Sequence, residues 1–114
     1  MKVFHHHIYE YTKGIRKLIL HTTRRENQHA VAKALRSKEI AHLIFPVGDH
    51  KINVFFGDAS CISVIKKFNK QHLNDFNPEQ DFILGVMLGY DTAMQCERYL
   101  KRSKRGALLK GLAA

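Results

Sequence analysis

The chain has little of several residues that often define a class of small protein: no tryptophan, two cysteines and two prolines. Cys61 and Cys96 stand far apart, with no C-x-x-C pair, so we expect two free thiols rather than a disulfide or zinc framework. The longest apolar run, residues 82–88, is far shorter than the roughly 20 residues of a membrane span. No signal-peptide pattern follows Met1, and we expect a cytoplasmic protein without a membrane segment.

Acidic residues are missing from one end of the chain. Lys and Arg total 19 against 10 Asp and Glu, a net charge of +9. Residues 98–114, the basic segment, contain no acid and carry +6, whereas residues 1–97 carry only +3. A field of one sign attracts acidic partners, although the same cations also stabilise a helix end and keep a protein in solution. The candidate partner-binding residues are Arg98, Lys101, Arg102, Lys104 and Arg105.

The first half of the chain alternates between helical and strand patterns. Residues 4–13 predict a short helix or an irregular lead-in that Gly14 ends, and residues 15–23 predict a strand from their alternating apolar positions. One longer helix from Ile8 to Leu20 is the alternative, because its apolar residues also fit a period of 3.6. The other elements of this half are a helix at 25–38 and a hairpin of strands at 41–46 and 51–56.

The second half predicts three helices with clear starting signals. Asp58 is a natural N-cap for a helix at 59–69. Asn77 followed by Pro78 begins a second, largely apolar helix. Asp91 caps a last helix that runs to about Ser103, and Gly106 ends its pattern.

These elements predict a single α+β domain over residues 1–114. A small three-stranded sheet, made from one α/β crossover plus a hairpin, is packed by about five helices in the order α-β-α-β-β-α-α-α. If strands 15–23 and 41–46 are adjacent and parallel, the helix between them makes a right-handed crossover.

The eight histidines suggest a metal site. The candidate ligands are His5, His6, His7 and Glu10, since His6 and Glu10 share one face of a helix. A metal site needs three or four ligands in a closed geometry, and no H-E-x-x-H motif is present. The structural alternative is a hydrogen-bonded polar corner.

Catalytic chemistry has even less support. Cys61 lies at a helix start, where the pKa of a thiol can fall, but it also fits an apolar stripe and no base accompanies it. We therefore assign no catalytic residue and no cofactor.

Gly85 and Gly89 are four residues apart and share a helix face. Small residues there permit either tight packing inside the domain or a dimer contact. The hydrophobicity of residues 82–88, and of the other face of the sheet with Ile44 and Phe55, favours a homodimer.

Nucleic-acid binding through the same cations is an alternative function. Tyr99 is the one aromatic residue of the basic segment, so base stacking has little support. If all six cations contacted phosphates, log K would fall against log salt with a slope of about −5.

Three segments, residues 6–11, 13–18 and 82–91, resemble a small bacterial family of unassigned function, domain of unknown function number twenty twenty-three. The resemblance covers essentially the whole chain and implies three strands, five helices and a homodimer. It transfers no catalytic or binding residue, because none is established for the family. It also implies an association with flavodoxin, beside which such proteins are often encoded. Flavodoxins are acidic electron carriers and would suit a basic partner.

The sequence therefore predicts a non-enzymatic, homodimeric binding or accessory protein for an acidic partner, with flavodoxin as the candidate. One alternative is a non-specific nucleic-acid-binding module. Another is a small enzyme or metal site built on the region of His5–His7, Glu10 and Tyr11.

Overall fold

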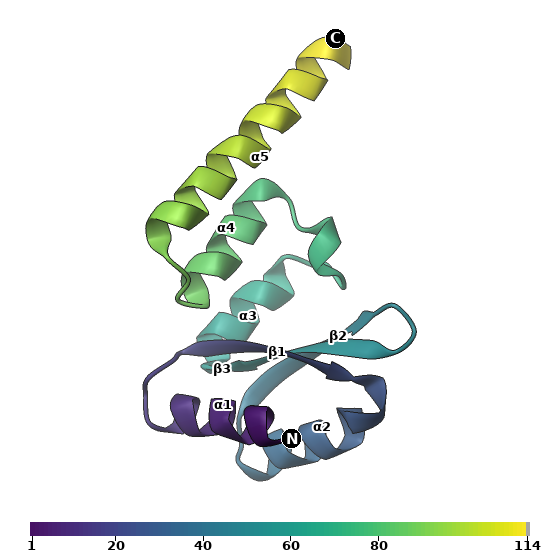
Figure 1. Ribbon diagram of the computed structural model, residues 1–114, viewed down its shortest axis with the longest axis vertical. Helices are drawn as coiled ribbons and strands as arrows, with labels where there is room; N and C mark the ends of the chain where they lie inside the picture. The colour runs from purple at the N-terminus through teal and green to yellow at the C-terminus, as the bar shows by residue number, and fades with distance from the viewer. Residues whose placement is uncertain (114) are drawn as a thin grey trace.

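A three-stranded antiparallel sheet lies between two sets of helices (Figure 1). The computed structural model describes the backbone of residues 1–113 and the side chains of residues 1–104. Strands β1 (Leu18–Arg24) and β2 (Ala41–Val47) both pair with β3 (Lys51–Gly57), which lies between them. The strand predicted at residues 15–23 is confirmed, although it begins later, at Leu18. The alternative prediction of one continuous helix from Ile8 to Leu20 is wrong, because α1 ends at Thr12.

The connection from β1 to β2 passes through η1 (Arg25–Asn27) and α2 (Gln28–Ser37). β1 and β2 run in the same direction, but they are not adjacent, because β3 returns between them. Six of the seven residues of β3 are buried, as expected for a central strand covered on both faces. The predicted α+β fold and its order of elements are confirmed.

Helices α1 (Lys2–Thr12) and α2 cover one face of the sheet, the α1–α2 face (Figure 1). Phe4 and Ile8 stand four residues apart on α1 and point into this core. Gly14, at φ +76°, supplies the left-handed turn after α1 that other residues adopt with strain. The buried core of this face consists of Phe4, Ile8, Ile19, Val31, Leu35, Ile40, Ile52, Val54 and Phe56.

The opposite face is covered by α3 (Ala59–Lys67), η2 (Leu73–Asp75) and α4 (Pro78–Met87). Phe55 is fully buried there, whereas Ile44 pairs with Val54 and is half-buried against the α1–α2 core. The prediction that Ile44 and Phe55 share one face of the sheet is therefore wrong, and helices cover both faces. This second core consists of Leu18, Phe45, Phe55, Ile62, Ile65, Phe76, Leu84 and Leu88.

α4 begins at the predicted capping signal. The Asn77 side chain accepts a hydrogen bond from the Gln80 backbone N–H at 2.8 Å, and the Gln80 side chain accepts one from the Asn77 N–H at 3.1 Å. This reciprocal capping box satisfies two N–H groups that the first turn of a helix leaves without partners.

α5 (Thr92–Ala113) starts at the predicted cap, with Asp91 accepting from the backbone N–H of Met94 at 2.9 Å. The sequence predicts that this helix ends between Ser103 and Gly106, but in the structure it continues to Ala113. One glycine inside a helix costs only about 1 kcal/mol relative to alanine, and no proline follows it.

α5 packs beside α4, and its C-terminal end lies far from the sheet (Figure 1). The molecule measures 52 × 31 × 23 Å, with a radius of gyration of 15.7 Å, against about 13 Å for a compact chain of this length. Within the described residues, no helix combines the length and apolar character needed to cross a membrane. The geometry thus presents the cations of α5 at one end of an elongated molecule.

Candidate functional site

Arg98 is held by a carboxylate of α4. Its Nε donates to Asp81 Oδ2 at 2.8 Å and its Nη2 donates to Asp81 Oδ1 at 3.2 Å. These hydrogen bonds, and then the charge of Asp81, raise the pKa of the Arg98 guanidinium above its ordinary value. This predicted partner-binding residue therefore also ties α5 to α4.

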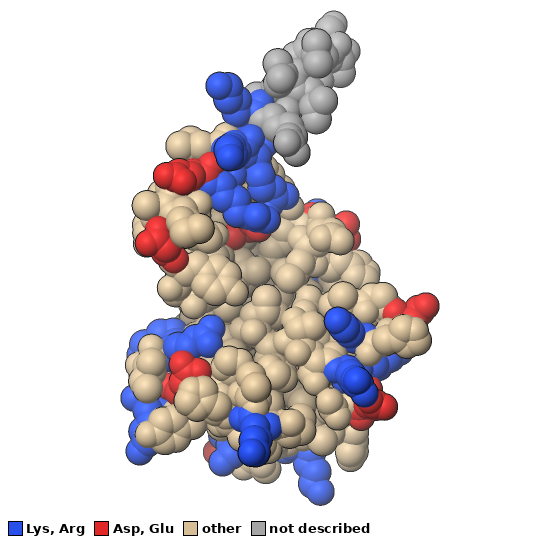
Figure 2. Space-filling view, in the orientation of Figure 1, with Lys and Arg blue, Asp and Glu red and all other residues tan. Residues whose placement is uncertain are grey.

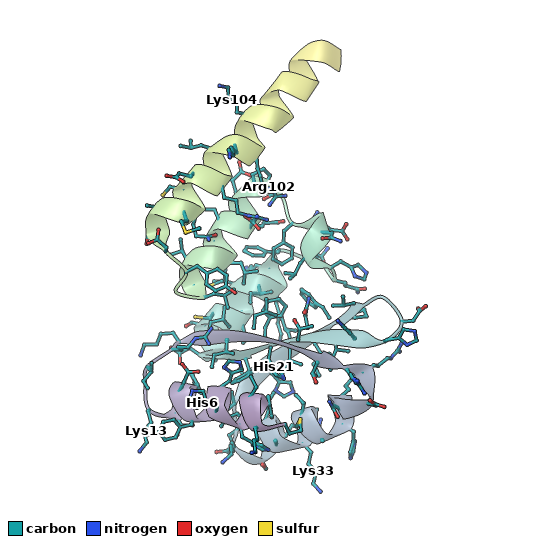
Figure 3. All side chains as sticks on the ribbon, in the orientation of Figure 1. His6, Lys13, His21, Lys33, Arg102 and Lys104 are labelled. Atoms are coloured by element: carbon teal, nitrogen blue, oxygen red, sulfur yellow. The ribbon has the colours of Figure 1, made fainter. Side chains whose placement is uncertain are left out.

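Arg102 lies one turn further along α5 and contacts the same acid. Its Nη1 is 3.3 Å from Asp81 Oδ1, and its Nη2 donates to the carbonyl oxygen of Phe76 at 3.1 Å. Figure 3 shows this side chain between α5 and the segment that precedes α4. Asp81 balances only one of the two guanidinium charges, so the group keeps a net charge of +1.

Lys101 and Lys104 are exposed on α5. Among the side chains that the structure describes, neither ammonium group forms an ion pair with an acid. Figure 2 shows Lys and Arg side chains gathered over this part of α5, and Lys104 points away from the body in Figure 3. The fifth candidate, Arg105, has a side chain outside the described residues.

A cleft of about 520 Å³ opens beside the two arginines. Sequence reasoning missed it, because its walls come from β1, η2, α4, α5 and the α4–α5 turn and meet only in the folded chain. We call it the rim cleft; it is lined by Leu20, Leu73, Asn74, Phe76, Asp81, Leu84, Gly85, Leu88, Tyr90, Gln95, Arg98 and Arg102.

Gly85 and Gly89 have different roles. A Cβ atom on Gly85 would collide with the Gln95 side chain of α5, so this position permits close packing of α4 and α5. Gly89 has a φ of +80° and no atom within 4 Å of an added Cβ, so it serves the turn that ends α4.

The outer side of the α4–α5 pair carries an apolar groove of about 540 Å³. Ile83 is 38% exposed and Leu100 is 64% exposed, and the Tyr99 ring lies 5.5 Å from that of Phe82. We call this surface the outer groove; it is lined by Glu79, Phe82, Ile83, Cys96, Tyr99 and Leu100.

The histidine run lies on α1 and points in several directions. Glu10 Oε1 is 3.7 Å from His6 Nε2 and 3.3 Å from His7 Nδ1. The His5 ring instead packs beside Phe4, with 5.6 Å between the ring centroids. Among the described residues, no group of three or more His, Cys, Asp or Glu side chains is arranged to hold a metal ion.

His21 of β1 lies between the sheet and α1 (Figure 3). Its ring is 5.4 Å from that of Phe4 and 5.5 Å from that of His7. Burial, followed by the charges of His7 and the N-terminus, lowers the pKa of His21 below its ordinary value. His7 and His21 are thus half-buried between α1 and the sheet, whereas His5 and His6 are exposed on α1.

Asp58 occupies the N-cap position of α3, but its side chain does not cap the helix. Its Oδ1 accepts a hydrogen bond from the Tyr11 hydroxyl at 3.0 Å, which links α1 to the start of α3. Burial, followed by the neighbouring Asp58, raises the pKa of the Cys61 thiol. The environment of Cys61 therefore does not favour an activated thiol, and Cys61 and Cys96 are both free and half-buried.

The geometry defines a small α+β domain with a cationic helix, an adjoining cleft and an exposed apolar groove. The chain belongs to the family described as "Protein of unknown function (DUF2023)", whose model matches residues 2–102 of the 114. The family resemblance of the sequence is thereby confirmed. No curated protein matches the chain significantly.

Proposed function

We propose that this protein is a non-enzymatic, cytoplasmic binding or accessory protein that recognises an acidic protein through α5. The observation that carries the proposal is the pair of exposed ammonium groups of Lys101 and Lys104, beside a group of two arginines and one aspartate. A concentration of charge on one helix steers and orients an oppositely charged partner. Flavodoxin, an acidic electron carrier, is the candidate partner.

A salt titration with purified flavodoxin tests the proposal. Lys101→Glu/Lys104→Glu should weaken binding at low salt at least about tenfold, because it turns attraction into repulsion. Lys33→Glu/Lys38→Glu is the matched control, since it changes the net charge equally at exposed positions in and after α2. Absence of binding by the unmodified protein at low salt, or equal binding by both variants, would refute the proposal.

The proposal includes a homodimer formed through the outer groove. Its support is the exposed apolar surface of Ile83 and Leu100, because apolar patches on small domains often mark contact surfaces. Ile83→Glu should shift sedimentation toward the monomer. Val64→Glu, at a position of the same 38% exposure on α3, should leave it unchanged. A monomeric unmodified protein would contradict the dimer.

Nucleic acid is less well supported as the partner. The Tyr99 ring packs beside Phe82, and its hydroxyl lies 3.5 Å from Glu79, so it does not offer a free stacking surface. Mobility shifts with duplex and single-stranded probes distinguish the two functions. Binding that is tighter for nucleic acid than for flavodoxin at the same salt would favour this alternative.

A further inference from the structure

The rim cleft places an apolar floor directly beside positive charge. Leu73 comes from η2, Leu84 from α4, Leu88 from the residue that follows α4, and Leu20 from β1. Leu84 and Leu88 are buried, whereas Leu20 and Leu73 are half-buried and reach the surface of the cleft. Its volume of about 520 Å³ lies within the roughly 300–1,000 Å³ of clefts that hold ligands. Clefts of this kind take an apolar group and orient it by a few polar contacts.

The positive charge of Arg98 and Arg102 at the rim of the cleft is only partly neutralised by acids of the same chain. Arg98 and Arg102 share the single carboxylate of Asp81, and their side chains are 58% and 35% exposed. Each guanidinium carries five N–H donors, more than the bonds to Asp81 and the Phe76 carbonyl use. A second carboxylate can therefore bind here without displacing the first.

We propose that the rim cleft binds a segment of an acidic protein in which a leucine- or phenylalanine-sized side chain lies beside a carboxylate. This inference rests on the proposed function and names the feature of the partner that is recognised. The apolar side chain contacts Leu20 and Leu73, the half-buried leucines of the floor, and the carboxylate accepts hydrogen bonds from Arg98 or Arg102. Buried apolar anchors next to arginine carry much of the binding energy in protein interfaces.

Ligands with only one of these features fit the cleft less well. A purely acidic surface is attracted by Lys101 and Lys104 and leaves the exposed parts of Leu20 and Leu73 in water. A purely apolar segment would cover the guanidinium groups without accepting their hydrogen bonds, which is costly. A segment that carries both groups satisfies the floor and the rim together.

Fluorescence anisotropy with the full chain and three labelled synthetic peptides tests the inference. The first peptide contains Glu and Leu, the second has Ser for each Leu, and the third has Gln for each Glu. We expect the first to bind at least about tenfold tighter than either of the others, because each lacks one of the two contacts. Equal affinity for the first two peptides would overturn the proposal that the rim cleft binds an apolar side chain. The proposed binding of an acidic protein through the charge of α5 would be unaffected by that result.

Substitutions in the protein test whether the first peptide binds in the rim cleft. Leu73→Ser should reduce the affinity for the first peptide to within about twofold of that for the second, whereas Val64→Ser on α3 should not change it. Circular dichroism shows whether both variants keep the fold. Equal affinity of the two folded variants for the first peptide, or no binding of any peptide at low salt, would overturn the inference. The flavodoxin titration then decides the proposed function separately.

Discussion

Asp81→Asn removes the one negative charge that holds two arginines of α5. Its carboxylate accepts both hydrogen bonds from Arg98 and pairs with Arg102. The asparagine keeps the shape and one acceptor oxygen but not the charge. We expect α5 to be held less firmly against α4, and the free energy of unfolding to fall.

The size of this effect follows from exposure. The Arg98 side chain is 58% exposed, so solvent screens its pairing, which contributes about 0.5–1 kcal/mol. Arg102 is 35% exposed and contributes a similar amount, about 0.5–1 kcal/mol. The sum, about 1–2 kcal/mol, corresponds to a midpoint lower by roughly 4 °C for each kcal/mol in a domain of this size.

Urea unfolding followed by circular dichroism measures the change. Glu97→Gln is the matched control, because it removes one exposed negative charge from α5 and Glu97 makes no ion pair among the described side chains. The difference between Asp81→Asn and the unmodified protein should shrink at high salt, since salt screens exposed pairs. A loss below about 0.3 kcal/mol at low salt, or a loss equal to that of Glu97→Gln, would refute this account of α5.

Three further predictions concern other parts of the fold. Gly85→Ala should change the free energy of unfolding by less than about 1 kcal/mol, because the Gln95 side chain must move away from the new methyl group while alanine gains about 1 kcal/mol in helix propensity; with Gln95→Ala also present, Gly85→Ala should stabilise the fold by about 1 kcal/mol. Asn77→Ala should cost about 1 kcal/mol in thermal unfolding, because the capping box is lost. The lowered pKa of His21 means that the unfolded chain binds more protons than the fold as pH falls below about 6.5. Stability should therefore decrease from that pH down to the lowered pKa, and His21→Gln should flatten this part of the stability–pH curve.

Secondary structure was largely predictable, because its signals are local. Asn77 and Pro78 mark the start of α4, and Gly14 ends α1 in a left-handed turn. The end of α5 was not predictable from Gly106 alone, since one glycine is a weak stop without a second signal. Ile44 was placed on the same face as Phe55, whereas the strand register pairs it with Val54 on the opposite face, because alternation along one strand does not say which residue of the next strand lies beside it.

The candidate site was predictable only in part. The cations of α5 follow from the sequence, but their partners do not, because Asp81 stands 17 positions before Arg98 in the chain. The same holds for Asp58, which has the sequence signal of a helix cap and instead accepts from Tyr11, 47 positions away. Long-range hydrogen bonds of this kind depend on how the helices pack.

The sequence by itself determined the element order, the family and the concentration of positive charge after residue 97, because these depend on composition, local pattern and motif. Only the tertiary structure decided which of these cations pair with an acid and which remain exposed to a partner. Packing of α5 on α4 brings Arg98 and Arg102 onto Asp81 and beside an apolar cleft, while Lys101 and Lys104 remain exposed. A net charge is a sum over residues, whereas the field that a partner meets depends on which charges the fold has already paired.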